Sequence, residues 1–141
     1  MGLTRGKKVV GRKRFVAVDT LGLLWAVMVT PASVQDRAGG IPLIQKLRAA
    51  VKRVKVVWGD SHFEPALRHA WVWWGWAGVV ARKLVGQKGF VPQRKRWIVE
   101  RTFGWLNRSR RLSKEYERTT ASSEAFIKVA MIHLMLRRLR P

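Results

Sequence analysis

Apolar residues along the chain first form short β-prone runs. Two of these runs, over 15–19 and 24–30, flank a Leu-Gly pair and predict a hairpin within 12–30. The second run is almost wholly apolar, which predicts a strand buried on both faces or nearly so. A third strand is expected over 54–58 and a fourth within 79–85.

Helical spacing marks the other ordered segments. Residues 41–53 carry apolar side chains three and four positions apart with cations between them, and 94–108 and 125–140 show the same pattern. A further helix is expected from Pro65 to Trp74, because proline is favoured in a first helical turn. Strands interspersed with helices predict an α/β or α+β layer structure.

Polar residues stand near two of the expected helix starts. Asp36 is a candidate cap for the helix over 41–53. Ser122 and Ser123 are candidate caps for the last helix, with Glu124 in its first turn.

The helix expected over 94–108 has two distinct faces. Ile98, Thr102 and Leu106 fall on an apolar face, and Glu100 falls on the opposite face among cations. Gly104 lies one turn beyond Glu100, so no side chain blocks the approach of another backbone there. By itself, the pattern is also typical of an ordinary salt-bridged surface glutamate.

Length and composition indicate one domain with a real core. The chain has 141 residues, of which 48% are apolar, and its lack of cysteine excludes a disulfide framework and a cysteine-ligated metal. The opening segment is basic and polar, unlike a signal peptide, and the longest apolar run, 70–81, is too short to span a bilayer. We therefore expect a cytoplasmic protein without a membrane partner.

The charge is the strongest global feature. The chain has 29 Lys and Arg against 8 Asp and Glu, a net charge of +21, which indicates a polyanionic partner such as nucleic acid. An anionic membrane is the alternative, but it favours one basic helix with a clean apolar face, and here the cations are spread over the chain. The candidate DNA-binding residues are Lys7, Lys8, Arg12, Lys13, Arg14, Arg94, Lys95, Arg96, Arg101, Arg108, Arg110 and Arg111.

Four tryptophans gather within 71–76. Core or interface packing is their expected role, because these rings bury the largest area. Base stacking is the weaker alternative, since the rings are not interleaved with cations.

Two carboxylates are candidates for chemistry. Asp60 follows a strand, where sites form in α/β folds, and Glu100 lies on a helix. In so basic a protein they suggest a divalent cation at a phosphodiester, because Mg²⁺ prefers carboxylate ligands. Acids at strand ends are also common as caps, so the two residues alone leave both interpretations open.

Longer stretches are more specific. Residues 11–23 (GRKRFVAVDTLGL), 32–37 (ASVQDR), 97–106 (WIVERTFGWL) and the basic stretch 110–118 resemble, in the same order, segments of DDE transposases from bacterial insertion sequences. Residues 57–60 resemble the strand that carries that family's second Asp. The resemblance spans nearly the whole chain.

The resemblance implies a fold, a site and a substrate. The fold is a ribonuclease-H-like mixed sheet with flanking helices. The site is an Asp, Asp and Glu triad that binds two Mg²⁺, with Mn²⁺ as a substitute, in which Asp60 is the second Asp and Glu100 the Glu. The substrate is double-stranded DNA, both element ends and target, which the family cuts and joins as an oligomer.

The family pattern also implies that one part is missing. In the family the first Asp lies on a strand upstream of the hairpin, whereas the first acid here is Asp19, in the hairpin itself. We therefore expect residues 1–141 to form a single, N-terminally truncated catalytic domain that lacks the first strand. The hairpin and the strand over 54–58 are expected to share a sheet that brings Asp60 and Glu100 together.

The missing first Asp leaves three functions open for this chain. It is an incomplete catalytic fragment that an upstream transposase fragment could complete, a non-catalytic basic DNA-binding protein, or an inactive remnant. The first is the interpretation we adopt.

Overall fold

The computed structural model describes residues 12–80, 94–114 and 116–140, and the structural statements below concern these residues. The described part has a mixed α/β architecture with two small sheets. In chain order its elements are β1 (Arg12–Val18), β2 (Leu24–Pro31), α1 (Asp36–Ala50), β3 (Val56–Gly59), the 3-10 helix η1 (Ser61–Phe63), α2 (Glu64–Trp74), β4 (Ala77–Val80), α3 (Arg94–Asn107), the 3-10 helix η2 (Arg110–Leu112) and α4 (Thr120–Leu139).

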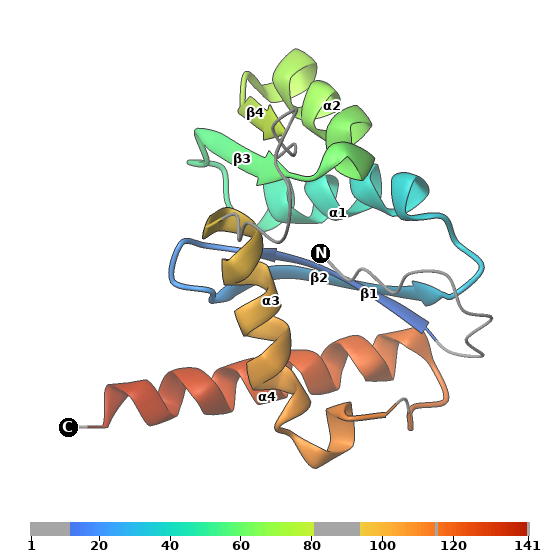
Figure 1. The fold of residues 1–141 in the computed structure, drawn as a ribbon, viewed down its shortest axis with the longest axis vertical. Helices are drawn as coiled ribbons and strands as arrows, with labels where there is room; N and C mark the ends of the chain where they lie inside the picture. Colours follow the sequence, from blue (N-terminus) through green and yellow to red (C-terminus); the bar gives the residue numbers. More distant parts are fainter. Residues whose placement is uncertain (1–11, 81–93, 115, 141) are drawn as a thin grey trace, which may run out of the picture.

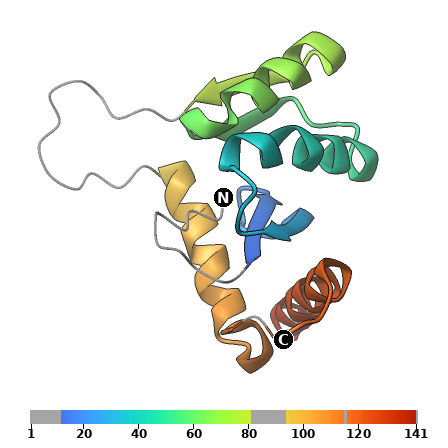
Figure 2. The same ribbon diagram turned by 90° about the vertical axis from the view of Figure 1, so that its right-hand side faces the viewer.

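The antiparallel β1–β2 hairpin lies in the middle of the molecule (Figure 1). Helix α1 covers one of its faces and α4 covers the other, while α3 packs against β1 at the edge of the hairpin (Figure 2). The second sheet and α2 lie beyond α1 (Figure 2). The hairpin is therefore the central layer of the fold.

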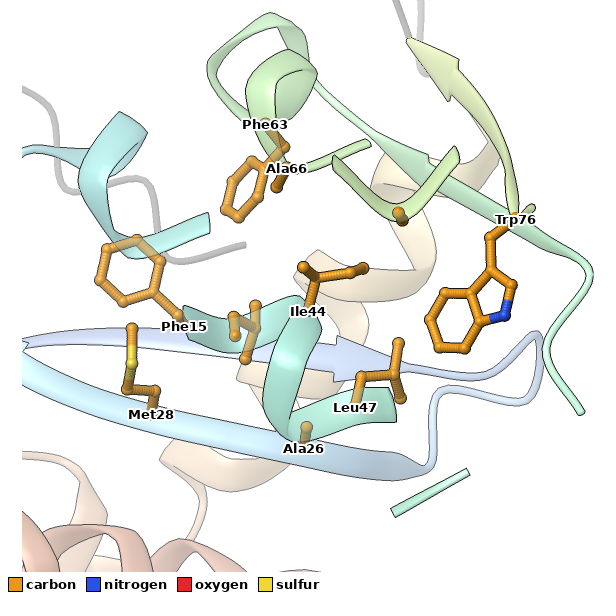
Figure 3. Close-up of a cluster of buried hydrophobic side chains, with 10 residues drawn as sticks. Phe15, Ala26, Met28, Ile44, Leu47, Phe63, Ala66 and Trp76 are labelled. Carbon is orange, nitrogen blue, oxygen red and sulfur yellow. The ribbon is translucent and has the colours of Figure 1, made fainter. Parts of the chain in front are cut away.

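Alternating side chains of the hairpin enter two separate cores. Phe15, Ala26 and Met28 point toward α1 (Figure 3), and Val16 and Val27 point toward α4. The first core consists of Phe15, Ala26, Met28, Leu43, Ile44, Leu47, Phe63, Ala66, Ala70 and Trp76. The second core consists of Val16, Val27, Val29, Leu106, Leu112, Ile127 and Met131.

Burial in β2 confirms the prediction made from its apolar run. Four consecutive residues, 26–29, are buried, which requires cover on both faces. The outer edge of β2 is closed as well: the Val29 amide donates to Glu124 Oε1 (2.9 Å), and Lys46 Nζ donates to the Val27 carbonyl (3.3 Å). Lys46 and Glu124 also pair with each other at 3.3 Å, so side chains of α1 and α4 engage two of the outward backbone groups of this edge.

The hairpin turn is fastened to α3. Asp19 Oδ1 accepts hydrogen bonds from the Leu21 and Leu23 amides (2.9 and 3.0 Å), and Gly22 takes a positive φ of 80°. The buried Thr102 hydroxyl donates to the Gly22 carbonyl at 2.7 Å. A Cβ on Gly22 would lie 2.9 Å from both Thr102 Oγ1 and the Trp105 ring, so only glycine lets the turn approach the helix this closely.

The second sheet differs from the expectation. Strands β3 and β4 pair in parallel, joined through η1 and α2, and β3 does not pair with the hairpin. The prediction that the hairpin and the strand over 54–58 share one sheet is therefore wrong for the described residues. None of the described strands pairs with both the hairpin and β3.

Helix α1 begins five residues before its predicted start. Gly39 and Gly40 precede the predicted helix over 41–53, and both lie inside α1. A Cβ at Gly39 would lie 2.5 Å from the Phe15 ring, so the glycine permits close packing of α1 on the hairpin. Asp36 is the first residue of α1 rather than its cap, which is Gln35.

The other predicted helices are found with shifted ends. Helix α2 follows the expectation closely, and α3 ends at Asn107. Neither serine caps α4: its N-cap is Thr119, whose hydroxyl accepts from the Ser122 amide (3.1 Å), and Ser123 is buried. The fourth strand is found at Ala77–Val80, and the rest of its predicted range lies outside the described residues.

The tryptophan segment divides between core and surface. Trp76 is buried in the first core and Trp74 packs against it, whereas Trp71 and Trp73 are 62% and 70% exposed. None of the helices in the described residues is long and apolar enough to cross a membrane.

Two glycine substitutions test how the turn is fastened. Gly22→Ala should lower the free energy of unfolding by about 2 kcal/mol, because alanine is strained at positive φ and would displace Thr102 and Trp105. Gly104→Ala is the matched control: a Cβ there meets nothing within 4 Å, so this change should stabilise the helix by about 0.5–1 kcal/mol. Urea unfolding measures both values, and equal effects of the two substitutions would contradict the proposed contact.

Candidate functional site

Asp60 lies directly after β3, at the carboxyl end of a parallel strand. Its Oδ1 accepts a hydrogen bond from the His62 amide (2.9 Å) and lies 3.5 Å from His62 Nδ1. It is the N-cap of η1, and its side chain is 16% exposed. Asp60 is thus both a cap and a partly buried carboxylate at a strand end.

Glu100 lies on the exposed face of α3, as the helical pattern predicts. The opposite face holds the helix in place: Thr102 and Leu106 are buried, and Leu106 belongs to the second core. Arg101 adds a tie to the hairpin, because its Nη2 donates to the Leu21 carbonyl at 3.2 Å. The helix that carries Glu100 is therefore fixed against the hairpin turn.

The elements that carry the two carboxylates pack into different cores. Phe63, three residues after Asp60, belongs to the first core, and α3 contributes Leu106 to the second. Among the described residues, no group of three or more acids and histidines comes together to hold a metal ion. The convergence of Asp60 and Glu100 remains a prediction.

Four other acids whose side chains are described have structural roles. Asp19 holds the hairpin turn and also accepts from Trp25 Nε1 (3.1 Å). Glu124 closes the edge of β2, Glu117 pairs with Arg111 (2.7 Å), and Glu64 pairs with Arg68 (3.5 Å). These four carboxylates therefore make contacts within the protein.

Three predicted DNA-binding cations on β1 donate hydrogen bonds to backbone carbonyls. Arg12 donates through Nη1 to Glu117 O (2.9 Å) and through Nη2 to Arg118 O (2.7 Å). Arg14 donates through Nη1 to Leu112 O (3.0 Å), and Lys13 donates to Val34 O (2.7 Å). Arg12 and Arg14 therefore fasten the basic segment 108–118 to β1.

The cations of that segment face solvent around this attachment. Arg108, Arg110, Lys114 and Arg118 are exposed, and Arg111 is held by Glu117 and lies over the Phe126 ring at 4.9 Å. The structure thus brings together two basic segments, 12–14 and 108–118, that are nearly a hundred residues apart in sequence. We call these two segments the basic surface.

The remaining predicted cations are only partly described. Arg94, Lys95 and Arg96 lie in α3, but their side chains are outside the described part, as are Lys7 and Lys8 entirely. Arg101 is half-buried, and its guanidinium lies 4.8 Å from the Trp105 ring. Its contacts with the turn and the ring indicate a structural role.

The sequence pattern alone does not separate the arginines that bind carbonyls from those that face solvent. A row of cations on a strand is compatible with a phosphate-binding arm. It is equally compatible with hydrogen bonds to backbone carbonyls, because the arginine side chain donates to both kinds of oxygen. One signal was present: the strand over 12–18 also carries core side chains, which holds its cations close to the body of the protein.

Comparison with known proteins places these features in context. The family described as "Transposase DDE domain" matches residues 2–135. A protein of Burkholderia cepacia, described as "Putative transposase for insertion sequence element IS402", is 30% identical over 131 residues. The match covers 84% of this chain and 60% of that relative, so the chain spans about three-fifths of the relative's length. No solved structure matches this chain.

The arginine attachment is testable by stability. Arg12→Ala removes two hydrogen bonds to carbonyls, one of them partly buried, and should lower the free energy of unfolding by about 1–3 kcal/mol. Arg110→Ala removes an exposed arginine from the same surface and should change it by less than about 0.5 kcal/mol. Equal stabilities for the two variants would exclude a structural role for Arg12.

Proposed function

Because this chain belongs to the transposase DDE domain family, as a DDE transposase of an insertion sequence, we propose that it binds duplex DNA through its basic surface and contributes Asp60 and Glu100 to strand cleavage and strand transfer in transposition. The observation that carries the proposal is the attachment of the segment 108–118 to β1, which concentrates exposed cations on one part of the protein.

Duplex DNA suits this surface for electrostatic reasons. Exposed arginines and lysines neutralise phosphates and release counterions, which gives affinity without sequence preference. Arg108, Arg110 and Lys114 are the candidates for direct phosphate contact, because they are exposed and their neighbours Arg12 and Arg14 are engaged with carbonyls. A net charge of +21 adds long-range attraction to any polyanion.

The complete domain is proposed to be ribonuclease-H-like. The hairpin, the strand that precedes Asp60 and the helix that carries Glu100 follow the family order along the chain. A further strand between β1 and β3 would join the two small sheets into one. An upstream transposase fragment, within an oligomeric complex, is the proposed source of that strand and of the first Asp.

Asp60 and Glu100 would hold Mg²⁺, with Mn²⁺ as a substitute, because carboxylate oxygens are the ligands that these ions prefer. A pair of ions, when bound, supplies charge stabilisation for the attacking and leaving oxygens of a phosphodiester. Two carboxylates supply part of the ligands of one ion and too few ligands for two ions. Asp60 brings a fixed orientation, because the His62 amide holds one of its oxygens, and Glu100 brings a charge on the outer face of α3.

A non-catalytic DNA-binding protein, or an inactive remnant, is the second candidate. One specific observation favours it for this chain: among the described residues, no third acid or histidine gathers with Asp60 or Glu100 to hold a metal ion. The two candidates share DNA binding and differ in cleavage. Cooperative unfolding of the soluble chain would show that it is a folded protein, as both DNA-binding candidates require, and not an unfolded remnant.

The DNA-binding proposal predicts a steep salt dependence. If six or more phosphates are neutralised, the affinity for duplex DNA should fall by about 10³-fold or more between roughly 50 and 200 mM salt. Replacing both Arg108 and Arg110 by Gln should reduce the slope of log affinity against log salt by about 2. The control is Lys52→Gln with Arg53→Gln, which removes the same charge from exposed positions after α1 and should leave most of the slope unchanged.

Salt-insensitive binding would contradict the electrostatic proposal. If both double variants reduced the salt slope equally, binding would still be driven by charge, but the basic surface would be excluded as its location.

Ligand counting predicts that the purified 141-residue chain binds DNA but does not cleave it in Mg²⁺ or Mn²⁺. The assay follows nicking of supercoiled DNA, with Glu100→Gln and Asp60→Asn as variants that should retain DNA binding. Cleavage that both substitutions abolish would confirm the site and refute the ligand count. Robust cleavage that neither substitution affects would show that the site assignment is wrong.

A further inference from the structure

Helix α4 is apolar on two opposite faces, and only one of them is covered by the described chain. Its inner face contributes Ile127 and Met131 to the second core, at 0% and 2% exposure. The outer face carries four large aliphatic side chains that are at least half exposed. They are Val129 (59%), Ile132 (50%), Leu136 (58%) and Leu139 (79%). None of the described elements lies on this side of α4 (Figure 2).

The spacing of these four residues is that of a coiled-coil seam. They are separated by three, four and three positions, so they form one straight stripe on the helix surface. A helix with apolar residues on all sides is normally buried on all sides. We call this stripe the α4 seam, and its length of about three turns suits a second helix better than a side chain or a small ligand.

The charges beside the seam restrict its occupant. Lys128 and Arg140 flank it, and Arg138 turns away to lie 4.3 Å from the Trp105 ring. The one acid on α4, Glu124, is engaged with Lys46 and β2. A parallel α4 pair would therefore place two cationic carboxyl ends side by side, with no acid to compensate.

An antiparallel pair of α4 helices avoids this clash. Val129 then faces Leu139 of the second copy, and Ile132 faces Leu136, which fills four apolar layers across a two-fold axis. Beside these layers, Arg140 meets the ring of Phe126, a favourable cation–π contact, and Lys128 meets Met135. His133 meets its own copy near the axis. No pair of Lys or Arg side chains is opposed in this register.

We propose that the α4 seam binds the α4 seam of a second copy of this chain, as an antiparallel helix pair. The contact is one helix face, smaller than a standard interface of about 1,600 Å², so we infer a weak dimer with a dissociation constant of about micromolar order. Repulsion between two chains of +21 opposes association, so the dimer should strengthen as salt screens the charge.

Sedimentation of the full chain without DNA, at about 1 M salt where the Debye length is about 3 Å, tests the association. We expect a reversible dimer, and Leu136→Glu should weaken it at least about tenfold, because a carboxylate would be buried in the seam. Val72→Glu, at a 69% exposed apolar position on α2, is the matched control and should leave the dimer intact. A monomer at all accessible concentrations, as expected if the seam instead binds an acidic helix of another protein, would overturn the proposal.

Disulfide trapping tests the orientation, because the chain has no cysteine of its own. His133→Cys should cross-link to its copy under mild oxidation. Val129→Cys should not, because ten residues of offset separate it from its copy by about 15 Å along the axis. Cross-linking of Val129→Cys in preference to His133→Cys would overturn the antiparallel register, and circular dichroism of both variants checks that α4 is intact.

Discussion

The two-sided burial of the β1–β2 hairpin is the interaction on which the rest of the structure depends. Each face of this two-stranded sheet supplies side chains to a different core, with α1 over one face and α4 over the other. A hairpin alone is only marginally stable in water, so the helices and the hairpin must form together. Burying a Val, Met or Phe side chain contributes about 1.5–3 kcal/mol. The hairpin buries five such side chains, those of Phe15, Val16, Val27, Met28 and Val29.

Side chains at the two ends of the hairpin attach the segments that carry Glu100 and the basic surface. Thr102 and Gly22 fasten α3, and hence Glu100, to the turn. Arg12 and Arg14 fasten the basic segment 108–118 to the opposite end of β1. Two stretches of family-like sequence, 11–23 and 97–106, are thus in direct contact, which gives a physical reason for their occurrence together.

Elements with strong periodicity could be predicted from the sequence, and those decided by tertiary contact could not. The burial of β2 was predictable from its continuous apolar run, and the two faces of α3 were predictable from the helical spacing of its apolar residues. The start of α1 was missed because Gly39 disfavours a helix locally, although the Phe15 ring requires a glycine there. The separate pairing of β3 was missed because the family order implies a shared sheet, while the strand that would join the halves is not among the described elements.

The local positions of the two candidate carboxylates were predictable from the sequence, whereas the contacts around them were not. Asp60 at a strand end and Glu100 on an exposed helix face both lie where the pattern puts them. Which cations bind carbonyls and which face solvent depends on contacts between segments about a hundred residues apart, which no local pattern encodes. The same contacts led us to propose the exposed cations Arg108, Arg110 and Lys114, rather than Arg12 and Arg14, for direct phosphate contact.

Hydrogen–deuterium exchange of the whole chain, with and without duplex DNA, tests the central claim most directly. DNA should slow amide exchange in 108–114 of the basic surface and leave α2, with its exposed Trp71 and Trp73, unchanged. Protection of α2 without protection of 108–114 would contradict the account, because it would locate DNA on the tryptophans rather than on the assembled cations.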